Sequence, residues 1–106
     1  MHEIIETVRN EGNGDCTVVI EPWGMPLQLP AGHTFTVIAR APVAGELEVT
    51  RDGEAVVIYA WPTSRVEVFA GDLLVERFAT PVPSVPPGQS VKRFLDHVFG
   101  RPSRAD

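Results

Sequence analysis

The sequence contains the side-chain types of a copper site, but they are scattered along the chain. Copper in electron-transfer proteins is bound by histidine, cysteine and methionine side chains. The candidates here are Cys16, Met25, His33 and His97. A metal site needs ligands that a short spacing or one structural element brings together, and these four residues have no such spacing. We therefore predict that the protein has no metal site and binds no cofactor.

A run rich in proline, glycine and aromatic residues, EPWGMPLQLPAGHTF at 21–35, is the strongest indication of a ligand pocket. Gly24, a gap of five residues and then the Pro-Ala-Gly turn at 30–32 resemble the spacing that opens the second conserved motif of cupins. In that family the turn directs a metal-binding histidine into a jelly roll. The position of that histidine is Phe35 here, and the chain contains no His-x-His signature. The resemblance therefore implies a jelly-roll pocket that works without a metal.

Two tryptophans and one histidine would line such a pocket. Trp23 and Trp61 each stand beside a proline at an expected strand end, where an indole ring either caps the core or stacks on a ligand. Two-residue alternation places His33 on the same strand face as Phe35. The pocket hypothesis thus assigns ligand binding to Trp23, His33, Phe35 and Trp61. The alternative is that the run only turns the chain between two strands and that both tryptophans cap the core.

The sequence shows no motif of a known catalytic site. It lacks a Gly-x-Ser-x-Gly nucleophile elbow, a His-Glu-x-x-His zinc motif and a glycine-rich phosphate loop. Glu46 and Glu48 share one expected strand face, and Glu67 with Arg65 is expected on a neighbouring strand, which is an arrangement that acid and base catalysis would use. Charges at every second position are, however, typical of the solvent side of an antiparallel sheet. We assign no catalytic residue and favour a protein without enzymatic activity.

Composition and charge restrict the class of protein and of partner. A chain of 106 residues with 43% hydrophobic residues is sufficient for one globular domain. Its net charge of −5 opposes binding to nucleic-acid phosphates. No stretch approaches the ~20 apolar residues of a membrane span, and the glutamate-containing N-terminal residues do not resemble a secretory signal. We expect a cytoplasmic protein with neither a nucleic-acid nor a membrane partner.

Alternating apolar residues and turn signals predict an all-β fold. Strands are expected over 16–21, 34–40, 46–51, 55–61, 65–69 and 73–78. The Asp-Gly pair at 52–53 predicts a tight hairpin, whereas the residues around Ile4 fit a helical turn or a strand equally well. We expect Glu46, Glu48 and Thr50 to form a solvent-exposed strand face. Short strands with frequent turns are typical of a small antiparallel β-sandwich or barrel, of which the jelly roll is one form.

The C-terminal part of the chain differs from the rest. We expect a β-domain at 1–79, a proline-rich connector at 80–89 and an amphipathic α-helix at 90–100 that packs on the same single domain. The tail from 91 to 106 has a net charge of +2, beside a body with a net charge of −7. The apolar residues of the helix recur at helical spacing: Val91, Phe94, Leu95, Val98 and Phe99.

A helix of about ten residues is too short to be stable alone in water, so its apolar face must pack on another surface. It either plugs the core of its own domain or contacts a second copy of the chain or another protein. The leading hypothesis is therefore a non-catalytic binding or assembly module whose partner is a homo-oligomer or another protein. The alternative is a metal-independent, cupin-like small-ligand binder or enzyme with a pocket near Trp23 and His33.

Overall fold

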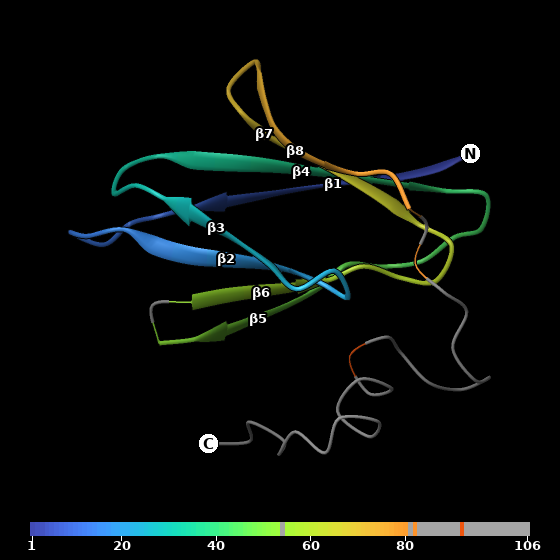
Figure 1. Cartoon of the computed structure of the whole chain (residues 1–106), viewed down its shortest axis with the longest axis horizontal. Helices are drawn as coiled ribbons and strands as arrows, with labels where there is room; N and C mark the ends of the chain where they lie inside the picture. Colours follow the sequence, from blue (N-terminus) through green and yellow to red (C-terminus); the bar gives the residue numbers. More distant parts are fainter. Residues whose placement is uncertain (54, 81, 83–91, 93–106) are drawn as a thin grey trace.

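Eight β-strands form two four-stranded sheets in the part of the chain that the structure describes (Figure 1). The structure is a computed structural model and describes residues 1–53, 55–80, 82 and 92. The all-β prediction is confirmed. In chain order the strands are β1 (His2–Arg9), β2 (Cys16–Glu21), β3 (Met25–Leu29), β4 (Thr34–Ala41), β5 (Glu48–Asp52), β6 (Ala55–Tyr59), β7 (Arg65–Ala70) and β8 (Leu73–Phe78).

The two sheets differ in the direction of their strands. Sheet A has the order β1-β4-β7-β8 and is antiparallel throughout. Sheet B has the order β3-β2-β6-β5, and its two central strands, β2 and β6, are parallel. The prediction of an antiparallel fold is therefore wrong at the centre of sheet B. Between β2 and β6 the chain passes through β4 in sheet A, and such a long crossover allows the two strands to run in the same direction.

Side chains from both sheets contribute to one hydrophobic core. Alternate residues of β4, which are Phe35, Val37 and Ala39, are at most 3% exposed, as two-residue alternation predicts. From sheet B, Ile20 of β2 and Ile58 of β6 are completely buried in the same cluster. β6 is apolar on both faces and lies between two neighbouring strands, which confirms its prediction as a central strand.

The run at 21–35 contains a strand that the sequence reading did not predict. β3 forms an antiparallel hairpin with β2, and the turn between them includes Gly24 at a φ of 72°, a conformation that favours glycine. Pro26 lies within β3, which is an edge strand, where a residue without an N–H does not interrupt the sheet. The interpretation of the run as only a turn is therefore wrong. Pro26 argued against a strand at this position, although an edge strand tolerates it.

The predicted hairpins are present, with differences in detail. Asp52 pairs with Ala55, so the β5–β6 turn lies one residue further along the chain than predicted. On β5, Val49 pairs with a buried residue of β6 on the core-facing side, and Glu48 and Thr50 lie on the outer side, as predicted. Glu48 and Thr50 are nevertheless half-buried, whereas Val49 is 36% exposed. β5 is an edge strand of sheet B, so its core-facing side is only partly covered. The N-terminal residues form strand β1 and no helical turn.

Most of the predicted C-terminal connector and helix lies outside the described residues. Val82 is described, is 3% exposed, and pairs through its backbone with the segment after β6. Its N–H donates to the Ser64 carbonyl at 3.0 Å, and its carbonyl accepts from the Thr63 N–H at 2.8 Å. Within the described residues, no helix is long and apolar enough to cross a bilayer.

The segment between β4 and β5 packs closely on Trp61, whose ring is 6% exposed. The indole N–H donates a hydrogen bond to the carbonyl of Val43 at 3.0 Å. Gly45 lies directly against the ring, and a Cβ atom at this position would overlap Cγ and Cδ1 of Trp61. The position therefore requires glycine for reasons of space.

We expect Gly45→Ala to lower the free energy of unfolding by roughly 1–3 kcal/mol, because the added methyl group forces the indole ring out of its packed position. Gly14→Ala is the matched control, since nothing lies within 4 Å of a Cβ atom there. Urea denaturation of both variants measures the effect. Equal stability of the two variants would contradict this account of Gly45.

Candidate functional site

The four residues of the predicted ligand pocket lie at opposite ends of the sheets. Trp23 and Trp61 follow the C-terminal ends of β2 and β6, which are adjacent because the strands are parallel. His33 and Phe35 lie where β4 begins, beside the end of β1. A strand such as β2, with six residues, spans about 17–20 Å, so the two pairs are well separated. The structure does not bring the four side chains together.

Each of these four side chains has a different environment. Trp23 is half-buried and stacks on Phe78 with 4.8 Å between ring centroids. Phe35 and Trp61 belong to the hydrophobic core, whereas His33 is exposed. In the described part of the chain, neither of the two cavities discussed below is lined by any of the four.

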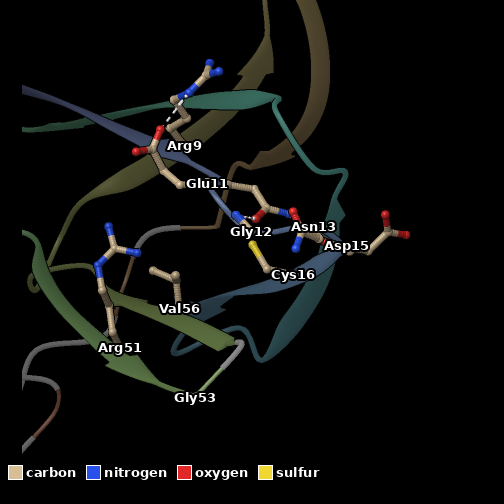
Figure 2. Close-up of a pocket in the computed structure, with 11 residues that line it drawn as sticks. Arg9, Glu11, Gly12, Asn13, Asp15, Cys16, Arg51, Gly53 and Val56 are labelled. Carbon is tan, nitrogen blue, oxygen red and sulfur yellow. Dashed lines mark hydrogen bonds and ion pairs between the residues drawn. The ribbon is translucent and has the colours of Figure 1, made fainter.

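A cavity of about 320 Å³ lies beside the β1–β2 loop (Figure 2). The loop at 10–15 lines one side of it, and Arg51 and Val56 of the β5–β6 hairpin line the other. Cys16 lies between these sides, at the start of β2. Arg9 donates from Nε to Glu11 at 2.9 Å at the rim, and both side chains are more than half exposed. The cavity is therefore an open depression at the surface, with charged side chains at its rim.

Asn10 determines the shape of the β1–β2 loop. It is 5% exposed, and its side-chain amide donates to the carbonyls of Gly14 at 2.7 Å and Leu29 at 2.9 Å. Its side-chain oxygen accepts from the Gly12 N–H at 2.9 Å. Its backbone N–H donates to His33, and its carbonyl accepts from the residue before His33. The sequence reading did not identify Asn10, because an asparagine in a glycine-rich loop reads as an ordinary turn residue.

The described residues contain no group of three or more His, Cys, Asp or Glu side chains that could hold a metal ion. The carboxylates considered for acid and base chemistry are also separated, because Glu48 lies in β5 of sheet B and Glu67 in β7 of sheet A. Glu67 is instead engaged by two arginines. Glu67 lies opposite Arg77 because of the register shift within the β7–β8 pair, whereas a regular hairpin would place Glu76 there. The sequence therefore carried no signal for this contact.

A chain of ion pairs crosses the outer face of sheet A, which is the face directed away from the core. We call it the charge ladder, and it joins one residue from each strand in turn. Arg40 donates from Nε to Glu3 at 2.7 Å and from Nη1 to Glu67 at 2.9 Å. Arg77 donates from Nε to the second oxygen of Glu67 at 2.8 Å. A cavity of about 280 Å³ lies next to the ladder, between the ends of β4, β7 and β8.

The ladder changes the pKa values of its central members. The hydrogen bonds from Arg77 and then Arg40 hold the pKa of Glu67 below its ordinary value of 4.5. The hydrogen bonds to Glu3 and then Glu67 raise the pKa of Arg40 above its ordinary value. Glu67 is the least exposed member, with 19% of its side chain accessible. Glu67 therefore remains ionised at neutral pH.

An apolar row runs beside the charge ladder on the same outer face. Ile5 of β1 pairs with Ile38 of β4, and Phe69 of β7 pairs with Leu74 of β8. Ile38 and Phe69 are diagonal neighbours, since Phe69 pairs with Thr36. Ile5 is 57% exposed and Leu74 is 36% exposed. We call these four residues the apolar row; large side chains gathered on a sheet face are typical of an interaction surface.

The outer face of sheet B has a different character. Val19 of β2 pairs with Val57 of β6, and both are half-buried. Alternation along β6 places Tyr59 next on this face, yet it is only 8% exposed and belongs to the cluster of buried hydrophobic residues. The Nζ atom of Lys92 lies 6.0 Å from the centroid of its ring, within the range of a cation–π contact. A residue of the C-terminal segment thus lies on this face.

We expect Asn10→Asp to lower the free energy of unfolding by roughly 2–4 kcal/mol, because the carboxylate cannot donate to the buried Leu29 carbonyl and faces two carbonyl oxygens. Asn13→Asp introduces the same charge at an exposed position of the same loop and should have little effect. Chemical denaturation at neutral pH compares the two. A similar loss in both variants would mean that charge alone, and not the lost donors, is responsible.

The charge ladder predicts a pH dependence. Because the folded state holds the pKa of Glu67 below 4.5, its ion pairs stabilise the fold fully above that pH. The stabilisation is lost as the pH falls through the lowered pKa, where the folded state also becomes protonated. Glu67→Gln should therefore cost roughly 0.5–1.5 kcal/mol at pH 7 and progressively less below pH 4.5. Unfolding curves between pH 7 and 3, with Glu6→Gln as control, measure this convergence.

Comparison with known proteins gives no match: no family model, no curated protein and no solved structure is significantly similar to this chain.

Proposed function

We propose that this protein is a non-catalytic binding and assembly module of the cytoplasm, built as a small β-sandwich with a C-terminal helix at 90–100 seated on the outer face of sheet B. The observation that carries the proposal is the position of Lys92 over the ring of Tyr59. Tyr59 is nearly buried although alternation along β6 places it on the outer face, and a segment packed on that face would account for its burial. The helix is the segment with apolar surface to cover.

The charge on this face favours the same segment. The residues of sheet B that point outward include Glu21, Glu48 and Asp52 and, among the described positions, no lysine or arginine. The tail from 91 to 106 has a net charge of +2. Opposite charges bring the segment to the face, and the apolar contact of Val19 and Val57 holds it there.

The apolar surface of the helix supplies enough free energy for docking. Burying five large apolar side chains contributes roughly 7–15 kcal/mol before the entropy of ordering is subtracted. The connector is also long enough for the helix to reach sheet B. Val82 is fixed beside Ser64, and the ten residue steps from Val82 to Lys92 span at most about 33–36 Å. These two arguments support docking of the helix on its own domain, as a cover for the sheet.

A second candidate function, small-ligand binding without a metal, is supported by the cavity beside Cys16 and not by the predicted pocket residues, which lie at opposite ends. Its volume of about 320 Å³ is within the range of small-molecule sites. Arg51 would bind an anionic group of the ligand. Titration with a panel of small carboxylates and phosphates, followed by the NMR signals of Gly12 and Gly53, tests this candidate; unchanged signals would exclude these ligands.

We expect Phe94→Asp to lower the free energy of unfolding by about 1–3 kcal/mol and to shift the NMR methyl signals of Val19 and Val57, because the variant places a charge in the docked apolar surface. His97→Asp, which adds a charge on the polar side of the predicted helix, is the matched control. If both variants behave like the unmodified protein, the helix does not cover sheet B. A molecular mass that halves only in Phe94→Asp would show that the helix is exchanged between copies.

A further inference from the structure

We propose that the outer face of sheet A is a self-association surface, on which a second copy of this chain packs face to face. This inference rests on the proposed function, since it names the partner of the assembly module. If the helix covers sheet B, the outer face of sheet A is the large sheet face that stays open. Two features of that face specify the partner: the apolar row and the charge ladder.

The apolar row supplies the attraction. Four large side chains, Ile5, Ile38, Phe69 and Leu74, cross the four strands of sheet A in one line. On a face that only contacts water, these positions would be polar, as two-residue alternation with one buried face requires. Packing the row against the same row of another copy removes both from water.

The charge ladder selects a second copy over other partners. Its charges alternate in strand order, with Glu3, Arg40, Glu67 and then Arg77. A two-fold axis that lies in the interface and runs across the ladder at its midpoint reverses this order on the partner. Each glutamate then faces an arginine: Glu3 faces Arg77 of the second copy, and Arg40 faces Glu67. The apolar row runs parallel to the ladder, so the same axis places row against row.

The charge ladder by itself is neutral, because it consists of two arginines and two glutamates. The same face also carries Arg9, which is paired with Glu11, and Arg65. These two arginines make the face weakly basic, but the other charges on this face of the four strands are paired within the ladder, which favours a self-complementary partner over nucleic acid or anionic lipid. Pairing through the β8 edge of sheet A is disfavoured as well, whereas β1 forms the other edge. The β7–β8 pair contains a register shift at Val68 and Phe69, and such a bulge interrupts the hydrogen-bonding edge that strand addition needs.

The size of the face predicts a weak, reversible dimer. Four strands about 4.8 Å apart and about seven residues long give a face of roughly 400–500 Å². Stable interfaces bury about 800 Å² on each partner. We therefore expect a dissociation constant on the order of 100 μM, with dimers formed only at high protein concentration. Sedimentation analysis of the full chain between 10 μM and 1 mM should show the monomer converting to a dimer.

Ile5→Glu tests the apolar row, because Ile5 is exposed and its replacement removes no core packing. We expect the dissociation constant to rise at least tenfold with an unchanged thermal unfolding midpoint. Val43→Glu changes an equally exposed apolar residue that lies outside sheet A and should leave dimerisation unchanged. A monomeric unmodified protein at 1 mM, or equal dimerisation of Ile5→Glu and the unmodified protein, would overturn the proposal.

The two-fold arrangement is tested by reversing one charge in each of two variants. Glu3→Arg alone places two arginines opposite each other, and Arg77→Glu alone places two glutamates opposite each other, so each variant should remain monomeric. Mixed in equal amounts, they should form a heterodimer, because both contacts between residues 3 and 77 are then of opposite charge. A mixture that remains monomeric would overturn this arrangement.

The outcomes separate this inference from the proposed function. Variants of sheet A should leave the methyl signals of Val19 and Val57 unchanged, and Phe94→Asp should leave the dissociation constant unchanged. If dimerisation is lost in Phe94→Asp and retained in Ile5→Glu, the helix and not sheet A joins the copies, and the inference is wrong while an assembly function remains. If Phe94→Asp changes neither stability nor the methyl signals but Ile5→Glu dissociates the dimer, the proposed position of the helix on sheet B is wrong and the self-association surface on sheet A is supported.

Discussion

The hydrogen bonding of one buried amide, Asn10, is the constraint on which the arrangement of one end of the protein depends. Its side chain and backbone together join the end of β1, the β1–β2 loop, the end of β3 and the turn before β4. These segments carry the chain between the two sheets. Because a buried amide must use its donors and its acceptor, these bonds favour the observed arrangement of the loops, and the cavity beside Cys16 is lined by the loop that they hold.

The same core carries two outer faces of different chemistry. On sheet A, paired charges and exposed aliphatic side chains alternate across the strands. On sheet B, the central valines and Tyr59 are partly or almost fully covered, and the outward charges are acidic. Our two proposals follow from this difference: a basic segment of the same chain suits the acidic face, and a self-complementary face suits a second copy.

Local sequence patterns predicted most of the strands, whereas the order and direction of the strands in the two sheets depend on long-range pairing. The alternation of β4 and the two hairpins could be predicted because their causes, side-chain period and turn residues, lie within a few positions. β3 was missed because Pro26 is a strand breaker except at an edge, and the sequence does not say which strand is at an edge. The predicted pocket failed to assemble for the same reason, since the distance from Trp23 to His33 depends on strand order. Asn10 gave no signal, because its partners are backbone groups, which every residue has.

The parallel pairing of β2 with β6 has a consequence for the order of folding. These central strands of sheet B are separated by all of β3, β4 and β5, so the sheet remains incomplete until the ribosome has released residues near Tyr59. Contacts between such distant segments require closure of a large loop and are associated with slow folding, on the scale of milliseconds to seconds. Until β6 is available, the β2–β3 hairpin therefore has an unpaired β2 edge, and unpaired strand edges favour aggregation.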